Sequence, residues 1–411
     1  MTRDEALALD AADPLARFRA AFELPEGLIY LDGNSLGPPP VALHERMTQV
    51  TREEWGHGLV RSWNSAHWIE APARVGGKIA KLIGAKPSEV TVADSTTVSL
   101  FKLAAGALSL RPGRKTILSE AGNFPTDLYA LQGLAALLGP ERARLRAMAP
   151  EALIDAIDED TAAVVLTQVH YKTSRRWDLK ALTDAAHAKG ALMIWDLCHS
   201  AGAIAVDLNG VGADLAVGCG YKYLNGGPGA PAFLFVAERH QAAIASPLTG
   251  WMGHAEPFAF EDGYRPARDI RGMITGTPPI LGLAALEAGV DLQLQADPAF
   301  VEAKGLALCD LFIAEAEARA ADPDLKLTGP REGGRRGLHV SLAHPAGYPL
   351  VQAMIARGII GDFRAPDIAR FGFSPLFLSY ADAWDAAHAL ADILATREWD
   401  QPQFHARSAV T

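Results

Sequence analysis

The sequence has few cysteines, no excess of positive charge and no long apolar run, and each shortage excludes a class of protein. Its three cysteines, Cys198, Cys219 and Cys309, are too few and too scattered for a disulfide framework or a metal site, which indicates a reducing, cytoplasmic setting. The net charge of −10 argues against a nucleic-acid partner, because binding to phosphate backbones needs clustered lysines and arginines. No stretch is apolar for long enough to cross a membrane, and the acidic start of the chain lacks the pattern of a signal peptide.

Two common nucleotide-binding motifs are also missing. The chain contains no G-x-x-x-x-G-K-[ST] loop and no G-x-G-x-x-G motif after a strand, so NTP or NAD binding has little support. Apolar residues make up 49% of the chain and charged residues 21%, which is typical of a globular enzyme. Because 411 residues exceed what one hydrophobic core usually holds, we expect one large and one smaller domain.

What the sequence does contain is an alternation of apolar segments with helical ones. Continuous apolar residues predict buried strands at 90–93, 161–169, 191–197, 214–219 and 232–236. Helices are predicted at 72–83, 98–109, 178–189 and 278–295, with Asp178 as an N-cap and with Gly84 and Gly190 just past two of the helix ends. This alternation predicts an α/β fold with a mostly parallel central sheet and helices on both faces.

The remaining segments predict a second unit. Residues 300–411 alternate helices with short strands such as 337–342, which is typical of a smaller α+β domain. We therefore expect a large domain over residues 51–285 and a small domain formed by residues 1–50 and 286–411.

Reactive side chains follow two of the predicted strands. Asp196 ends one strand and is followed at once by His199, and Lys222 comes just after the next strand among small and aromatic residues. In open α/β sheets the ligand lies beyond the carboxyl ends of the strands. A partly desolvated lysine is a nucleophile towards carbonyls, and a carboxylate can keep a pyridine nitrogen protonated. A simple turn at Lys222 and an N-cap role for Asp196 are the alternative interpretations.

A third feature is a run of hydroxyl side chains at a predicted helix start. Ser95, Thr96 and Thr97 precede an apolar helical segment, where unpaired N–H groups and the helix dipole favour a phosphate. Ordinary N-capping by threonine would produce the same pattern.

These residues belong to a wider set of motifs that resembles the kynureninases, which are fold-type-I enzymes dependent on pyridoxal phosphate (PLP) and lie close to the class-V aminotransferases. The motifs are L-D-G-N-S-L-G at 31–37, F-P-T-D at 124–127, W-D-L-C-H-S at 195–200, Y-K-Y-L-N-G-G-P-G at 221–229, G-W-M-G-H at 250–254, G-T-P-P at 276–279 and R-F-G-F-S-P-L at 370–376. The resemblance thus covers nearly the whole chain. It implies the fold of the type I PLP-dependent transferases, with 51–285 as the PLP-binding domain, and a homodimer with sites shared between subunits.

The resemblance also implies a role for each matching residue. Lys222 would hold PLP as a Schiff base, with Asp196 at the ring nitrogen and His199 beside it. The other expected cofactor contacts are Thr96, Thr97 and Tyr221 at the phosphate, Phe124 stacked on the ring with Pro125, Thr126 and Asp127 next to it, Thr167 near the ring hydroxyl, and Trp251 and Thr277 from a second subunit. Arg370, preferred over Arg364, would bind the α-carboxylate of the amino-acid substrate. Ser35, Trp63 and Thr277 would surround the substrate's aromatic ring.

The implied reaction is hydrolysis of L-kynurenine, or of its 3-hydroxy derivative, to anthranilate or 3-hydroxyanthranilate and L-alanine, as in tryptophan catabolism and pyridine nucleotide biosynthesis. Lys222 would act as the general base, and Tyr221 is the expected acid. A class-V aminotransferase and a cysteine desulfurase-like enzyme are the alternatives. The second needs a mobile cysteine late in the chain, and no cysteine follows Cys309. A non-catalytic binding protein built on the same fold is a third alternative.

Overall fold

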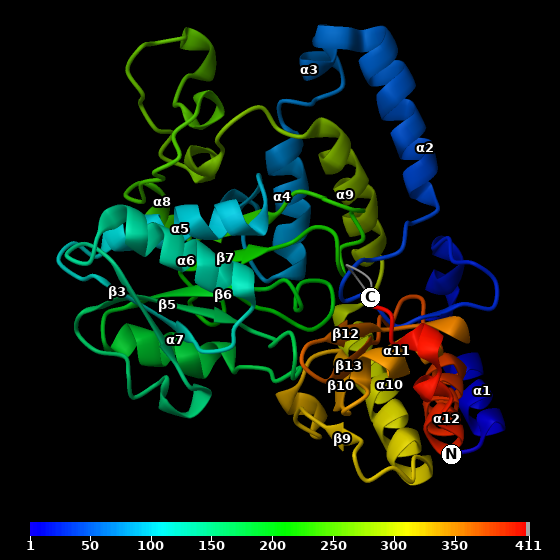
Figure 1. Cartoon of the computed structure of the whole chain (residues 1–411). Helices are drawn as coiled ribbons and strands as arrows, with labels where there is room; N and C mark the ends of the chain where they lie inside the picture. Colours follow the sequence, from blue (N-terminus) through cyan, green and yellow to red (C-terminus); the bar gives the residue numbers. More distant parts are fainter. Residues whose placement is uncertain (408–411) are drawn as a thin grey trace.

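The structure, a computed structural model, describes residues 1–407, and its largest sheet has seven strands in the order β2-β8-β7-β6-β5-β3-β4 (Figure 1). Within this sheet only β8 runs antiparallel to its neighbours, which confirms the predicted mostly parallel sheet. The strands are β2 (Val90–Val92), β3 (Thr116–Glu120), β4 (Arg144–Met148), β5 (Thr161–Thr167), β6 (Leu192–Asp196), β7 (Leu215–Gly218) and β8 (Phe233–Val236).

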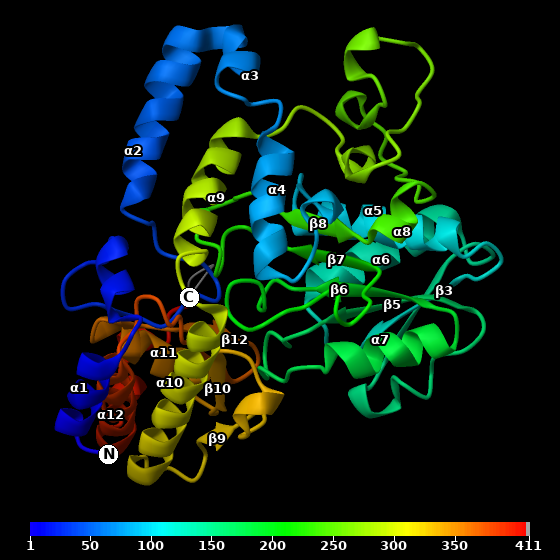
Figure 2. The same cartoon turned by 180° about the vertical axis from the view of Figure 1, so that it is seen from behind.

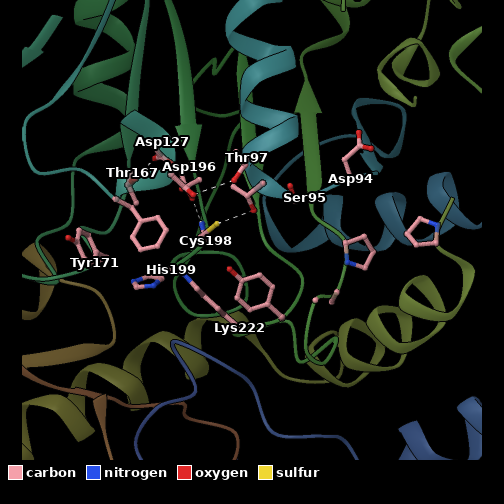
Figure 3. A pocket seen from close by; sticks show the side chains of 18 residues that line it. Asp94, Ser95, Thr97, Asp127, Thr167, Tyr171, Asp196, Cys198, His199 and Lys222 are labelled. Atoms are coloured by element: carbon pink, nitrogen blue, oxygen red, sulfur yellow. Dashed lines mark hydrogen bonds between the residues drawn. The ribbon is translucent and has the colours of Figure 1, made fainter. Parts of the chain in front are cut away.

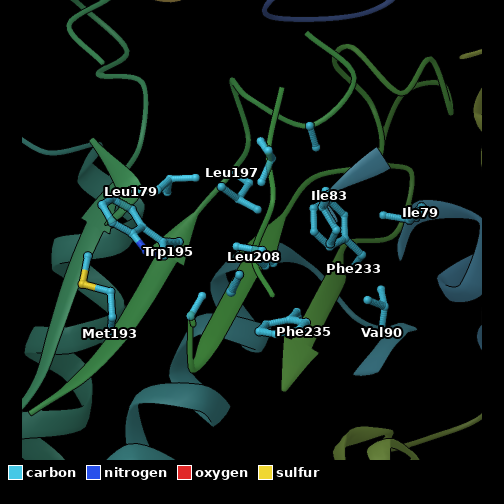
Figure 4. Close-up of a cluster of buried hydrophobic side chains, with 14 of the residues drawn as sticks. Ile79, Ile83, Val90, Leu179, Met193, Trp195, Leu197, Leu208, Phe233 and Phe235 are labelled. Carbon is cyan, nitrogen blue, oxygen red and sulfur yellow. The ribbon is translucent and has the colours of Figure 1, made fainter. Parts of the chain in front are cut away.

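Helices cover both faces of this sheet because successive strand residues point to opposite sides. In β5, Ala163 and Val165 pack in one cluster with α5 (Thr96–Leu110) and α6 (Pro125–Leu138). Val164 and Leu166 belong to the cluster on the other face, with α4 (Ala71–Leu82), α7 (Leu179–Ala188) and α9 (Ile280–Gln293), part of which Figure 4 shows. Burying each such Leu, Ile or Val side chain contributes about 1.5–3 kcal/mol.

The helix ends follow local signals in the sequence. The Asp178 side chain accepts a hydrogen bond from the N–H of Ala181 at the start of α7, as an N-cap does. Gly84 and Gly190 follow the ends of α4 and α7 with positive φ angles of 61° and 72°, a conformation that glycine adopts without a steric penalty. These caps confirm the predicted boundaries of both helices to within about two residues.

A second sheet lies beside the first and has its own core. Its four strands are antiparallel in the order β12-β13-β10-β9, and two further strands, β1 and β11, pair in parallel. These strands are β1 (Ile29–Tyr30), β9 (Lys326–Leu327), β10 (His339–Ala343), β11 (Ile359–Ile360), β12 (Asp362–Arg364) and β13 (Ile368–Gly372). The helices around them are α1 (Arg3–Ala12), α10 (Pro298–Arg319), α11 (Gly347–Ala356) and α12 (Tyr380–Thr396).

The N-terminal segment joins this second core. Leu15, Phe18 and Leu31 are buried in the same cluster as the apolar faces of α10, α11 and α12. The predicted domain boundary at residue 285 falls inside α9, whose residues contribute to both cores, and the division of the chain into domains stays a prediction.

Two segments project from this body on the same side in both views (Figures 1 and 2). One contains α2 (Ala42–Gln49), a π-helical segment Val50–Gly58 and α3 (Ser62–Ser65). The other follows α8 (Glu238–Gln241) and forms the irregular loop up to α9. Among the helices of residues 1–407, none is long and apolar enough to cross a membrane.

Candidate active site

A cavity of about 540 Å³ lies at the carboxyl ends of β5, β6 and β7, beside the first turns of α5 and α6. Its position and size are typical of a ligand site in an open α/β fold. Figure 3 shows the labelled side chains around it. The predicted residues that line the cavity are Thr96, Thr97, Phe124, Thr126, Asp127, Thr167, Asp196, His199, Tyr221 and Lys222.

Lys222 reaches the cavity from the loop after β7. The loop is held by backbone hydrogen bonds from Asn225 N to Lys222 O and from Gly226 N to Gly220 O, 3.0 and 2.8 Å long. The Lys222 Nζ lies 5.7 Å from the centre of the Phe124 ring. Among the residues described, none forms a side-chain hydrogen bond or ion pair with this ammonium group, so the amine is available for a ligand.

Two aspartates, Asp127 and Asp196, line the cavity close to each other, as Figure 3 shows. Asp127 lies fully buried in the first turn of α6, where its Oδ2 accepts a 3.1 Å hydrogen bond from the Asn123 side chain. Burial and the neighbouring Asp196 raise the pKa of Asp127 well above its usual value. Asp127 therefore stays protonated near neutral pH, and Asp196 accepts a 2.6 Å hydrogen bond from Cys198 N.

The start of α5 forms another wall. Ser95 is the N-cap, and its Oγ accepts a hydrogen bond from Val98 N. The capping residue is thus the serine and not a threonine, and both threonines belong to the first helical turn. Thr96 Oγ1 lies 3.7 Å from Cys198 Sγ, and Thr97 Oγ1 donates to Thr126 Oγ1 across 3.4 Å. A helix start lined with hydroxyl groups suits an anion.

His199 lies against the cavity as a neutral imidazole. Burial, with a smaller effect of the Lys222 charge, lowers its pKa well below the usual value. Its Nδ1 is buried without a hydrogen-bond partner, and its ring packs edge-on against His339 with centroids 5.3 Å apart.

Arg370 lies next to the cavity on β13 and is almost fully buried. Its Nε and Nη2 bind the two carboxylate oxygens of Asp362 at 2.8 and 2.5 Å, and Nη2 also donates to Ser35 Oγ at 2.8 Å. Its Nη1 donates to the carbonyl of Tyr171, a residue that lines the cavity. Arg364 contacts the same Asp362 but is more exposed, with 33% of its side chain accessible.

Three predicted site residues lie away from this cavity. Trp63 is half-buried in α3 and packs edge-on against Trp68, whereas Trp251 and Thr277 are exposed at the two ends of the projecting loop. Pro125 begins α6 directly after Phe124 without lining the cavity.

The cavity also contains residues that sequence reasoning did not assign to the site. Tyr171 packs edge-on against Phe124, with ring centroids 5.1 Å apart, and Asp94 lies beside the phosphate-binding candidates. Cys198 also lines the wall. Tyr171 follows strand β5 as Lys222 follows β7, so its position after a strand was the signal that could have revealed it.

Taken together, the residues that line the cavity suit the chemical groups of PLP. The cavity offers the Lys222 amine for its aldehyde, the Asp196 carboxyl group for its ring nitrogen, an aromatic ring at Phe124 and a helix start for its phosphate. The residues that the structure describes contain no group of three or more His, Cys, Asp or Glu side chains that could hold a metal ion.

Comparison with known proteins points to one family over the whole chain. Residues 29–337 match the class-V aminotransferase family, and residues 301–390 match the kynureninase C-terminal domain. Curated kynureninases from Pseudomonas fluorescens and Burkholderia mallei are each 50% identical to the chain over 414 residues, with 100% of both proteins covered.

Solved structures agree on the fold. A cysteine desulfurase from Thermococcus onnurineus NA1 has a TM-score of 0.77 at 19% identity, covering 93% of this chain and 98% of its own. A C-DES variant with glycine covalently linked to its PLP cofactor has a TM-score of 0.78 at 17% identity, covering 91% and 99%. At such low identity the likeness shows the fold alone.

Proposed function

The chain belongs to the kynureninase family of PLP-dependent hydrolases that act on a carbon–carbon bond, and from this premise we propose that its cavity hydrolyses L-kynurenine to anthranilate and L-alanine. The observation that supports this best is the meeting of Lys222 with the Asp127–Asp196 pair in one cavity, in a chain half-identical to curated kynureninases. The 3-hydroxy derivative is the alternative substrate of the same reaction.

We assign the cofactor contacts as follows. Lys222 is the amine that holds PLP, Asp196 with the protonated Asp127 faces the ring nitrogen, and Phe124 covers the ring. Thr96 and Thr97 hold the phosphate at the start of α5. When bound, PLP supplies an electron sink that stabilises negative charge at substrate carbon atoms.

The protein's own groups then orient the substrate and move protons. Arg370 binds the α-carboxylate, since its guanidinium is already held rigidly by Asp362. Lys222 takes the proton from the substrate's α-carbon as general base. Water adds to the γ-carbonyl, the bond between the β- and γ-carbons breaks, and Tyr221 donates a proton to the β-carbon. Burial raises the pKa of Tyr221, which keeps this phenol protonated at neutral pH.

The test of this function is anthranilate formation from L-kynurenine by PLP-loaded protein without a keto acid. We expect stoichiometric anthranilate and L-alanine. A requirement for a keto-acid acceptor would favour a class-V aminotransferase instead. Lys222→Ala should abolish turnover and the visible absorbance of the bound cofactor, whereas Lys180→Ala, an exposed lysine on α7, should change neither.

A cysteine desulfurase needs a reactive cysteine thiol late in the chain, and Cys309, the last cysteine, is not suited to that role. Cys309 lies fully buried in α10, and burial raises its pKa to about 12. Such a thiol forms almost no thiolate near neutral pH.

We also propose that the protein acts as a cytoplasmic homodimer in tryptophan catabolism and pyridine nucleotide biosynthesis. The two projecting segments expose large apolar side chains that a monomer rarely leaves in water: Trp55, Leu59, Val60, Trp251, Phe258 and Phe260. The same segments carry Trp63, Trp251 and Thr277, which supports a second copy as the group that covers them. Light scattering of the holoenzyme should give twice the chain mass of 43.7 kDa, and a monomeric mass would contradict the proposal.

A further inference from the structure

Lys102 is a fully buried lysine on α5, and the proposed mechanism does not use it. Its Nζ donates 2.6 Å to Asp94 Oδ2 and 2.5 Å to the carbonyl of Met273. Its side chain has no accessible surface, whereas a quarter of the Asp94 side chain remains accessible. A buried charge of this kind is kept only where a partner of opposite sign compensates it.

Asp94 faces the cavity at the end where the phosphate would bind. It lines the wall together with Ser95, Thr96 and Thr97, and it immediately precedes the N-cap of α5. Its φ of 54° is left-handed, a conformation that aspartate and asparagine tolerate better than other residues with a side chain. The backbone is thus arranged to place a carboxylate beside an anion site, where like charges would repel each other.

We propose that Lys102 is a positioning residue that neutralises Asp94 and so allows this end of the cavity to accept the phosphate of PLP. This inference rests on the proposed function. The ammonium group is fully buried and Lys102 is not among the residues that line the cavity, so it offsets the carboxylate's charge without contacting the cofactor. Burial lowers the pKa of Lys102, and the hydrogen bond and charge of Asp94 oppose that shift.

The same ion pair fixes the segment that returns from the projecting loop. Thr275 Oγ1 donates to Asp94 Oδ2 across 3.4 Å, and Met252 N donates to the Thr275 carbonyl across 3.3 Å. Lys102 Nζ also donates a hydrogen bond to the carbonyl of Met273, two residues before Thr275. The pair therefore connects the phosphate-binding turn with the segment that carries Trp251 and Thr277.

The test is a set of PLP titrations with Asp94→Asn, Lys102→Met and the double variant, with pyridoxal as the probe that lacks a phosphate. Asparagine keeps the shape and the left-handed preference of Asp94 and removes only its charge. Lys102→Met should weaken PLP binding by at least about tenfold, and the double variant should recover to within about threefold of the wild type. Affinity for pyridoxal should stay within about threefold throughout, because the effect acts through the phosphate.

Three results would overturn the inference. The inference fails if Lys102→Met binds PLP like the wild type, if the double variant is no better than Lys102→Met, or if pyridoxal loses as much affinity as PLP. If Lys102→Met does not fold, Asp94→Asn decides alone: it should bind PLP at least as tightly as the wild type, whereas a loss of about tenfold confined to PLP overturns the inference. A wild-type protein that takes up neither ligand would instead overturn the proposed function and this inference with it.

Discussion

Asp32 and Asp362 are two neighbouring carboxyls whose charges differ because their partners differ. Asp362 accepts hydrogen bonds from Arg370, Arg364 and Ser35, and the positive charge of Arg370 lowers its pKa to about 2 against the effect of burial. Asp32 has a buried Oδ1 without a partner, and burial together with the charge of Asp362 raises its pKa to about 7. The folded protein thus keeps Asp32 protonated in a range where an unfolded chain would ionise it.

This difference predicts a pH-dependent effect of Asp32→Asn on stability. The stabilisation from protonated Asp32 is complete below its unfolded pKa of 3.8 and is lost as pH rises towards 7. Relative to the wild type, Asp32→Asn should therefore gain on the order of 2 kcal/mol of unfolding free energy between about pH 5 and pH 8. Urea unfolding of both proteins at the two pH values measures this. The exposed Asp155→Asn is the control, and an Asp32→Asn difference that does not change with pH would contradict the assignment.

Arg370 and Arg364 allow a matched test of substrate recognition at the residue scale. Both contact Asp362, but only Arg370 also binds the Tyr171 carbonyl at the cavity wall. Lysine keeps the charge and loses the planar fork of donors. We expect Arg370→Lys to raise KM for L-kynurenine by roughly 30-fold with a smaller change in kcat, and Arg364→Lys to raise it by less than about threefold. The reverse ranking in steady-state kinetics would assign the carboxylate site to Arg364.

At the scale of elements, α9 determines where the Lys222 loop lies. A β-carbon at Gly289 would lie 2.1 Å from the carbonyl oxygen of Leu224, so the helix packs directly on the backbone that follows Lys222. At Gly133, on the exposed face of α6, a β-carbon would meet no atom within 4 Å. The two helices therefore contain one glycine required by packing and one that is not.

This contrast predicts opposite effects of the same substitution. Gly289→Ala should lower the unfolding free energy by about 1–3 kcal/mol and weaken PLP binding, because the Lys222 loop must shift. Gly133→Ala should raise the unfolding free energy by about 0.5–1 kcal/mol, since alanine favours the helix, and should leave PLP binding unchanged. Thermal unfolding and PLP titration of both variants are the measurements. Equal effects of the two substitutions would show that α9 does not position the loop.

The helices and strands that were predicted correctly are those whose own sequence carries a clear local signal. Strands β5 and β6 were predicted because they are continuously apolar, and α4 and α7 because they carry caps. Strand β4, with the sequence Arg-Leu-Arg-Ala-Met, was missed because it lies half-exposed at the sheet edge. Helix α6 was missed because its apolar residues do not follow a clear helical stripe.

The site, too, contains residues that local sequence signals predicted and contacts that they did not. Asp196 and Lys222 were found because one ends a predicted strand and the other follows the next strand, and a strand end is a local signal. The contacts of Lys102 with Met273 and of Asp362 with Ser35 join residues 171 and 327 positions apart. No periodicity or motif in the sequence specifies such contacts, because they depend on how distant elements pack.

At the scale of the whole molecule, the proposed homodimer would bring Trp251 and Thr277 of one chain to the proposed site of the other. Trp251 and Thr277 lie outside the cavity and are exposed, on a segment that projects from the body together with α2 and α3. A two-fold symmetric dimer would place the same surface of each copy against the other. Under this arrangement Lys222 serves its own chain's site, whereas Trp251 serves the site of the second copy.

Mixed dimers test this arrangement directly. Lys222→Ala dimers should be inactive, and Trp251→Ala dimers should bind PLP weakly and turn over slowly. When the two variants are unfolded together and refolded, half of the dimers should be mixed, and each mixed dimer should contain one complete site with Lys222 from one chain and Trp251 from the other. Activity should then recover to roughly a quarter of the wild-type value per chain. Refolding each variant alone is the control. If Trp251 instead serves the site of its own chain, no mixed dimer has a complete site, and the mixture will be no more active than the average of the separate variants.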